Sequence, residues 1–293
     1  VEVLDAARQP LGWQQPEFDD AHWQQAQVIT NAVEPAPVFV EVDLPVMRFG
    51  WSRVQQLVSF WAVDAQPAPL KPRQTCEVLG ESLQEEVWQP CASESANTVQ
   101  WNPAAGELRV DGLHADRGLA VVLDMGSEQV GNIMFDCRCE TAGVIEIAWS
   151  EVMRNGRPEV VHKGTTYADR LLAKPGYQQW DALQFTGLRY LVLIMRGFAG
   201  SVRFTNIGVR TSTAAPKLQA AFGSSDQRLN DIWQLCANTL TIGTQETIID
   251  CPSREQAPYL GDGHLVGRWL GMLSGDYRHW RYIFELGFEG QAA

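Results

Sequence analysis

The sequence predicts a multidomain β + α protein in which an antiparallel, jelly-roll-like β-sandwich is followed by helices. From about residue 35 to residue 212, apolar and polar residues alternate between turn residues, as in antiparallel sheets with one buried face. After Thr211–Pro216 the apolar spacing changes to three and four residues, the period of amphipathic helices. We therefore expect three domains: a β-rich accessory region at 1–100, the sandwich at 101–213 and a helical domain at 217–293.

Turn signals justify the individual strands. The alternating runs Ile133–Cys139 and Val144–Trp149 predict a hairpin, and Asn155-Gly156 predicts a tight turn because both residues tolerate positive φ. Two more strands are expected at 188–195 and 202–209. Prolines near the start of the stretch 66–100 weaken strand pairing there, so a domain junction is expected in that stretch.

Three helices follow. The first is predicted by the shared face of Leu229, Ile232, Trp233, Cys236 and Leu240. Ser224 or Ser225 would cap it, with Asp226 at the positive end of its dipole. The second is expected at about 263–273, with Leu265, Trp269 and Met272 on one face, and the third from about Tyr277.

Composition excludes several classes of partner and cofactor. A formal net charge of −12 disfavours phosphate backbones and anionic lipid, so neither nucleic acid nor membrane is an expected partner. The six cysteines lack the paired spacing of a zinc site, and Cys137 and Cys139 are expected to be reduced core residues. The start of the chain lacks signal-peptide features, and with the sparse cysteines this predicts a reducing, cytoplasmic compartment.

The connection between the first two helices, residues 247–264, carries the residues best suited to chemistry. Asp250, Arg254, Glu255 and Asp262 lie there, and two prolines and two glycines prevent a continuous helix. Glycoside cleavage needs one carboxylic acid and one carboxylate, and neighbouring carboxylates raise each other's pKa. From the pattern alone, a solvated turn, helix caps at Asp250 or Asp262 and simple charge compensation by Arg254 stay open.

The acidic loop also carries a family resemblance. Asp250-Cys251-Pro252-Ser253-Arg254-Glu255 followed by Gly261-Asp262 resembles the signature of the family 78 glycoside hydrolases, the inverting bacterial α-L-rhamnosidases. Segments 13–23, 123–151 and 184–190 are similar to β-domain segments of that family, more diffusely. The sequence departs from the commoner pattern by lacking an acidic residue between Arg254 and Glu255, and by Tyr259-Leu260 where Gly-Trp is usual.

The resemblance implies that 217–293 begins an (α/α)₆ catalytic barrel and that the protein hydrolyses terminal α-L-rhamnosyl residues with inversion. By the same resemblance Glu255 is the general acid, Asp250, Arg254 and Asp262 hold rhamnose hydroxyls, and Tyr259 replaces an indole wall. The general base would lie downstream, because 217–293 is too short for twelve helices, so these residues alone are expected to be inactive.

The expected partner is a rhamnose-containing saccharide or glycoside, with no cofactor and no metal, and a homodimer is left open. The sequence leaves two other functions open. One is a non-catalytic carbohydrate-binding sandwich, and the other is an (α/α)₆ glycosidase for a different sugar.

Overall fold

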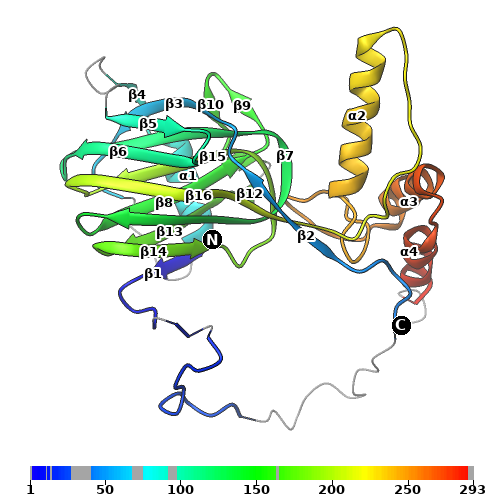
Figure 1. Cartoon of the computed structure of the whole chain (residues 1–293), viewed down its shortest axis with the longest axis horizontal. Helices are drawn as coiled ribbons and strands as arrows, with labels where there is room; N and C mark the ends of the chain where they lie inside the picture. Colours follow the sequence, from blue (N-terminus) through cyan, green and yellow to red (C-terminus); the bar gives the residue numbers. More distant parts are fainter. Residues whose placement is uncertain are drawn as a thin grey trace.

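The computed structural model describes residues 2–10, 12–13, 15–27, 41–67, 75–91, 98–162 and 165–289. Within these ranges the chain is β-rich, with one large sheet and few helices (Figure 1). The twelve strands of the large sheet are β1 (Val3–Asp5), β2 (Arg48–Arg53), β3 (Gln56–Val63), β4 (Gln89–Pro90), β5 (Val99–Asn102), β6 (Glu107–Leu113), β7 (Gly118–Cys139), β8 (Gly143–Ser150), β13 (Ala168–Ala173), β14 (Gly176–Asp181), β15 (Thr186–Arg196) and β16 (Gly200–Thr213).

Two short ribbons complete the β-structure. They are β9 (Met153–Arg154) with β10 (Arg157–Pro158), and β11 (Val161–His162) with β12 (Thr165–Thr166). The predicted Asn155-Gly156 turn joins β9 to β10, and both residues have positive φ. Strands β1 to β4 join the same large sheet as the later strands, while the division into domains at residue 100 stays a prediction.

The 22-residue strand β7 organises the sheet. Its first half pairs with β3 and β15, and its second half pairs with β14 and β16, so one strand belongs to two layers. The main core lies between them, where Val121 and Leu123 of one layer share a cluster with Phe135, Trp180 and Phe204 of the other. The predicted antiparallel pairing is confirmed for the large sheet except at β1, which runs parallel to β13.

A second core lies on the other face of the first layer. Helix α1 (Thr75–Glu85) covers it, and Leu79 and Leu83 pack in one cluster with Ala120, Val122 and Val192. A sheet with both faces covered needs apolar residues at consecutive positions, which the run 119–123 provides. The expectation of one buried face is therefore wrong here, and the stretch before residue 100, expected to be β-rich, also contains this helix.

The cysteine prediction is confirmed, because Cys137 and Cys139 are free thiols buried in the main core. No helix in the described part of the chain is both long enough and apolar enough to cross a membrane.

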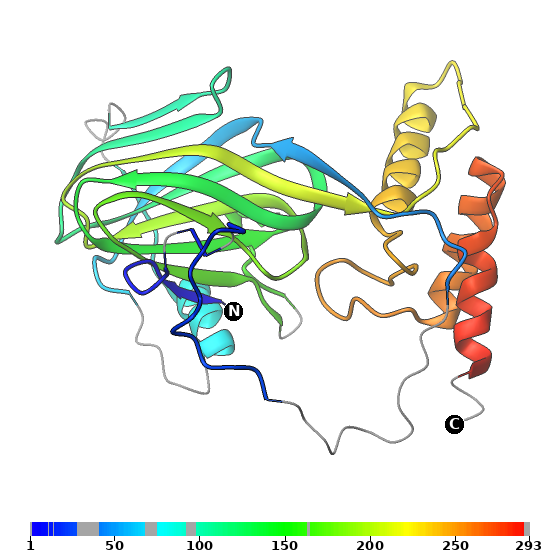
Figure 2. The ribbon, with the colours of Figure 1, turned by 60° about the horizontal axis from the view of Figure 1, so that its bottom comes forward.

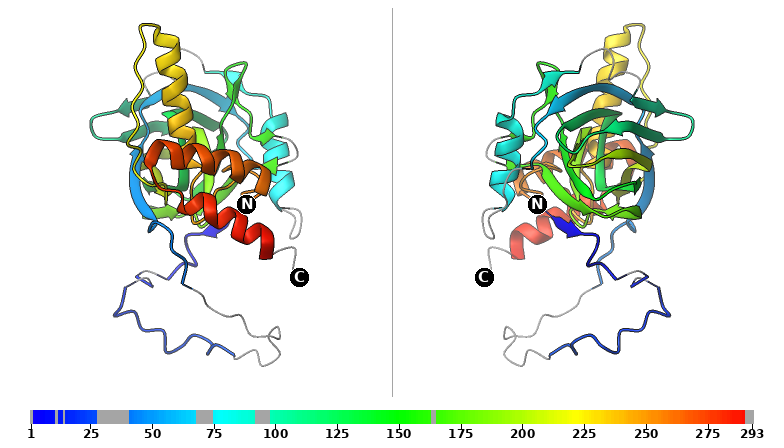
Figure 3. Two further views of the ribbon diagram at one scale, coloured as in Figure 1. Left: turned by 90° about the vertical axis from the view of Figure 1, so that its right-hand side faces the viewer. Right: turned by 90° about the vertical axis from the view of Figure 1, so that its left-hand side faces the viewer.

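Three helices, α2 (Gln227–Ile242), α3 (Leu260–Ser274) and α4 (Arg278–Glu289), lie together at one end of the sheet (Figure 3). The cap of α2 differs from the prediction. Asp226 is the N-cap residue, and its carboxylate accepts the Arg228 N–H at 3.0 Å. Ser224 instead accepts the Asp226 N–H at 3.1 Å and shapes the turn before the helix.

Helices α3 and α4 pack through glycines. A Cβ at Gly263 or Gly267 would lie within 3.0 Å of Ile283 or Trp280 of α4, and one at Gly271 would lie equally close to Tyr277 just before α4, so only glycine allows this approach. The face of α3 shared by Leu265, Trp269 and Met272 is not the one that packs on α4, because all three residues are more than half exposed. Leu229 and Ile232 of α2 are exposed as well.

The fold contains a buried carboxyl that should make stability depend on pH. Asp169 is fully buried on β13 and accepts the Glu2 N–H at 2.6 Å. Burial, helped by the charge of Glu2, raises the pKa of Asp169 from 3.8 to about 7. In the folded protein Asp169 therefore holds its proton to higher pH than in the unfolded chain. Its contribution is complete below about pH 4 and is lost as pH rises through about 7.

Replacing Asp169 by asparagine should remove this dependence, because the amide is neutral and its oxygen can still accept the Glu2 N–H. Relative to the variant, the wild-type protein should lose up to roughly 4 kcal/mol of unfolding free energy between pH 4 and pH 8. Urea unfolding at several pH values measures the difference. Parallel pH curves for the two proteins would contradict the assignment.

Candidate active site

The acidic loop connects α2 to α3 and extends from the helices toward the sheet (Figure 2). Its base is fixed by the buried side chains of Ile248 and Ile249 and by the Thr244–Ile248 bridge. The Asp250 N–H donates to the Ala257 carbonyl at 3.1 Å, and the Ala257 N–H donates to the Asp250 carboxylate at 2.9 Å. These bonds close the segment 250–257 into a compact loop on which Arg254 and Glu255 are exposed.

Asp250 thus has a structural task in addition to its predicted role. One carboxylate oxygen closes the loop, so one of the two remains for a substrate hydroxyl. Partial burial acts to raise the pKa of Asp250, but hydrogen bonds from the Ala257 N–H and the Cys251 thiol outweigh it, and the pKa is lowered. Asp250 is an ionised acceptor at neutral pH.

Glu255 and Arg254 form a bidentate ion pair. The Arg254 Nε donates to Glu255 Oε2 at 2.7 Å, and its Nη2 pairs with Oε1. The Cys251 thiol donates to Glu255 Oε2 at 3.2 Å, and this bond is the main cause that lowers the pKa of Glu255, with Arg254 adding to it. The expectation that neighbouring carboxylates raise this pKa is wrong for the unliganded loop, because the nearest groups are a cation and a thiol donor.

Tyr259 and Asp262 lie beyond the closed loop, at the start of α3. Tyr259 is the N-cap residue, with an exposed ring, and Asp262 lies in the first helical turn. Within the described residues, neither side chain forms a hydrogen bond or ion pair with the loop carboxylates. The structure therefore brings together Asp250, Arg254 and Glu255, and leaves Tyr259 and Asp262 free at the adjacent helix end.

One group of donor atoms in the described part of the chain has a spacing that a metal ion could use. The ligand atoms of Asp250, Cys251 and Glu255 lie within 4.8 Å of one another. The Arg254 guanidinium already occupies both oxygens of Glu255, however, and the Ala257 N–H occupies an oxygen of Asp250. The prediction that the site holds no metal stays a prediction.

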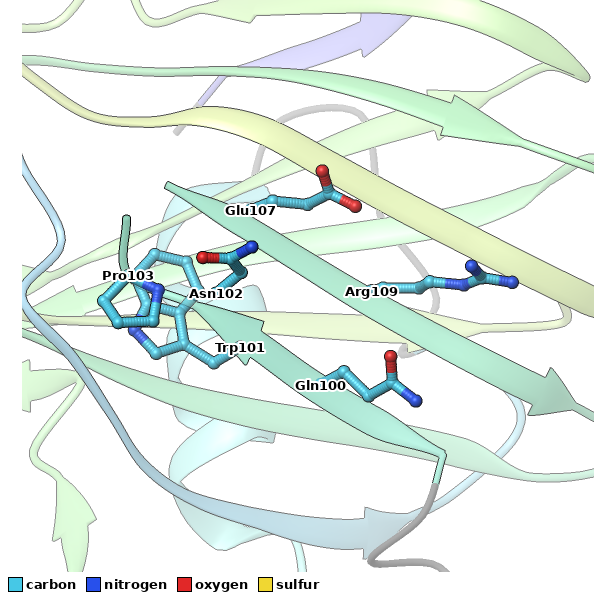
Figure 4. A pocket seen from close by; sticks show the side chains of 6 residues that line it. All are labelled: Gln100, Trp101, Asn102, Pro103, Glu107 and Arg109. Atoms are coloured by element: carbon cyan, nitrogen blue, oxygen red, sulfur yellow. The ribbon is translucent and has the colours of Figure 1, made fainter. Parts of the chain in front are cut away.

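A shallow hollow of about 420 Å³ lies far from this loop, on the β5–β6 hairpin (Figure 4). It is lined by Gln100, Trp101, Asn102, Pro103, Glu107 and Arg109. The Trp101 ring packs partly into the main core, and Glu107 and Arg109 are engaged in ion pairs with Arg203 and Asp111. We place the chemistry at the acidic loop, because the hollow lacks free carboxyl groups.

The loop also rests on sheet residues that sequence reasoning did not single out as functional. The Ser253 hydroxyl donates to the Glu151 carboxylate, and the Gln256 amide donates to the Phe185 carbonyl at 2.9 Å. Glu151 directly follows β8, about a hundred positions before Ser253, and no local pattern links residues so far apart in sequence.

Part of the chain matches a known protein family, and solved structures share its fold. Residues 217–286 match the family described as the bacterial alpha-L-rhamnosidase 6 hairpin glycosidase domain. A GH78-family rhamnosidase of Bacillus sp. GL1 superposes with a TM-score of 0.58 and 25% identity, over 68% of this chain and 20% of that chain. The segment 217–286 is therefore of the bacterial α-L-rhamnosidase type. The resemblance noted in the sequence is thereby confirmed.

Two further solved structures share the fold of this chain. A rhamnosidase from Klebsiella oxytoca with rhamnose bound has a TM-score of 0.55 and 17% identity over 82% of this chain and 44% of that chain. The Streptomyces avermitilis alpha-L-rhamnosidase complexed with L-rhamnose has a TM-score of 0.52 and 17% identity over 92% of this chain and 21% of that chain. The chain thus spans less than half the length of these rhamnosidases. A search of curated protein sequences gave no match.

Proposed function

We propose that this chain forms part of an inverting glycoside hydrolase that removes terminal α-L-rhamnosyl residues from glycosides or polysaccharides. The observation that supports this proposal is the acidic loop. Asp250, Arg254 and Glu255 lie close together there, within the segment that matches the rhamnosidase family. In this proposal the two β-layers are the β-sandwich that precedes the catalytic domain, and α2 to α4 begin an (α/α)₆ barrel. The exposed apolar residues of α2 and α3 are consistent with packing against further helices.

Glu255 is proposed as the general acid. It donates a proton to the glycosidic oxygen as the bond from that oxygen to the anomeric carbon breaks, and the aglycone leaves as an alcohol. A second carboxylate, about 6.5–9.5 Å away, takes a proton from the water that attacks the opposite face of the sugar. That base is proposed to lie outside these residues, since they cover less than half of each of the solved rhamnosidases.

Substrate binding must reverse the ionisation of Glu255 for this mechanism to work. The Cys251 thiol and Arg254 hold the carboxylate in its charged form, whereas a general acid must carry a proton. We propose that a rhamnose hydroxyl draws Arg254 away from Glu255, while the sugar excludes water from the carboxyl. Both changes raise the pKa of Glu255. Asp250, Asp262 and Tyr259 are proposed to contact the same sugar.

The test is hydrolysis of 4-nitrophenyl α-L-rhamnoside by the full-length protein that contains residues 1–293, beside other aryl glycosides. We expect release of nitrophenol from the rhamnoside, initial formation of the inverted anomer by NMR, and no turnover by residues 1–293 alone. If the protein hydrolyses the glycoside of another sugar faster, it is a glycosidase of different specificity. Saccharide binding without hydrolysis of any glycoside would favour a binding module, with the β5–β6 hollow as its first candidate site. A homodimer and a cytoplasmic location stay predictions.

A further inference from the structure

The acidic loop is held against one edge of the sheet by contacts of residues on both sides of Glu255. The Ser253 hydroxyl donates to Glu151 at the end of β8. The Gln256 amide donates to the Phe185 carbonyl at 2.9 Å and to the Pro252 carbonyl at 2.7 Å. Glu255 lies between these two anchored positions, so its placement depends on them.

The same edge is shaped to let the loop approach. A Cβ on Gly187 of β15 would lie 2.6 Å from Pro252 Cγ and 2.9 Å from the Ser253 hydroxyl. The backbone of Gly187 lies outside the left-handed region, so an alanine there would be excluded by contact with the loop and not by backbone strain. The close approach is specific to this segment of the chain.

A second carboxyl group, that of Glu128, interacts with Glu151. Glu128 of β7 is partly buried and shares a hydrogen bond with Glu151. Burial, with the negative charge of Glu151 adding to it, raises the pKa of Glu128 from 4.5 to about 7. Glu128 is therefore mostly protonated below a pH of about 7 and can donate to Glu151, which accepts the Ser253 hydroxyl. The other ionisable groups near this edge are Tyr167, Cys251 and Arg254.

We propose that Glu151, Glu128 and Gly187 form a positioning edge through which the sheet sets the place of Glu255 in the active site. The inference rests on the proposed function of Glu255. Proton transfer requires heavy atoms about 2.6–3.2 Å apart, and a misplacement of about 1 Å can cost about a hundredfold in rate. The edge residues act through the loop and need not touch substrate.

The carboxyl pair gives the positioning edge a pH dependence with a definite sign. Below a pH of about 7 Glu128 keeps its proton and donates to Glu151. Above that value both carboxyls are ionised and repel each other, and the edge loses its hold on Ser253. Loop anchoring should therefore be complete in acid and weaken as pH rises through about 7.

The activity test compares Glu151→Ala, Gly187→Ala and Ser253→Ala in the full-length protein. Each should lower kcat about 10–100-fold with a smaller change in KM, and Glu151→Ala with Ser253→Ala combined should cost no more than either alone. Glu140→Ala is the matched control, since it removes another Glu–Ser hydrogen bond of 2.8 Å, to Ser201, at the end of β7. Gly223→Ala controls for Gly187→Ala, because a Cβ there meets no neighbour within 4 Å.

Amide hydrogen exchange of segment 251–257 tests the edge without any hydrolysis. In the 293-residue chain, Glu151→Ala should speed this exchange about 10–100-fold, as expected for loss of a hydrogen bond to a charged acceptor. The wild-type segment should lose protection between pH 6 and pH 8.5, after correction for intrinsic rates, whereas Glu128→Gln should keep it. If the wild-type protein hydrolyses no glycoside but these shifts appear, the proposed function fails and the edge stands. If Glu151→Ala changes neither kcat nor the exchange of segment 251–257, the proposal that this edge positions Glu255 is wrong.

Discussion

In the full-length protein, Glu255→Gln should lower the hydrolysis of an unactivated rhamnoside by about 10²–10⁴-fold with little change in KM. Glutamine keeps the shape of the side chain and can still accept from the Cys251 thiol, but it has no proton to transfer to the leaving oxygen. The loss should therefore appear in kcat. Initial rates on a rhamnosyl disaccharide measure it.

The nature of the leaving group separates proton donation from a structural effect. A 2,4-dinitrophenolate departs without protonation, so the Glu255→Gln variant should hydrolyse that rhamnoside at a rate much closer to wild type. Glu246→Gln is the matched control, because Glu246 is an exposed glutamate in the same connection between α2 and α3. Equal losses on both substrates would mean that Glu255 is not the proton donor.

Loss of Glu146 should cost about 3–5 kcal/mol of unfolding free energy. Glu146 on β8 has no exposed surface, and it accepts hydrogen bonds from Arg170 and, at 2.7 Å, from Arg196. Arg196 is bound in turn by Glu86 at 2.6 Å. In Glu146→Leu, Arg196 would lose its carboxylate partner on β8 and keep only Glu86 of its two carboxylates, so the dehydration of its guanidinium would be less well compensated.

Urea unfolding followed by tryptophan fluorescence would measure this cost. Asp181→Ala is the control, since it removes an ion pair to Arg210 of 3.1 Å in which both side chains are more than 40% exposed. An exposed pair contributes about 0–1 kcal/mol, so the control should unfold close to wild type. A similarly small effect in Glu146→Leu would show that water reaches the buried arginines.

Much of the architecture and the candidate loop follows from local sequence. Period-two alternation is a property of neighbouring residues, and it predicted strands at 133–139 and 144–149. The hairpin expected between them is wrong, because β15 is inserted between β7 and β8 and pairs with both. The Asn155-Gly156 turn followed from residues that tolerate positive φ. Helical periodicity after residue 216 likewise predicted α2 to α4. The acidic run at 250–255 carried both the family resemblance and the candidate catalytic residues, because those residues are contiguous in the chain.

Contacts between distant segments could not be predicted in this way. Which face of α3 is buried depended on the space that glycines leave for α4, and the cover on the second core came from α1, a helix inside a proline-flanked stretch. The pKa of Glu255 depended on the rotamers that bring the Cys251 thiol and Arg254 onto its carboxylate. The positioning edge unites Glu128, Glu151 and Ser253 only after the sheet has closed. Sequence thus determined the elements and the acidic loop, and tertiary structure decided their environment, because packing and electrostatics act through space.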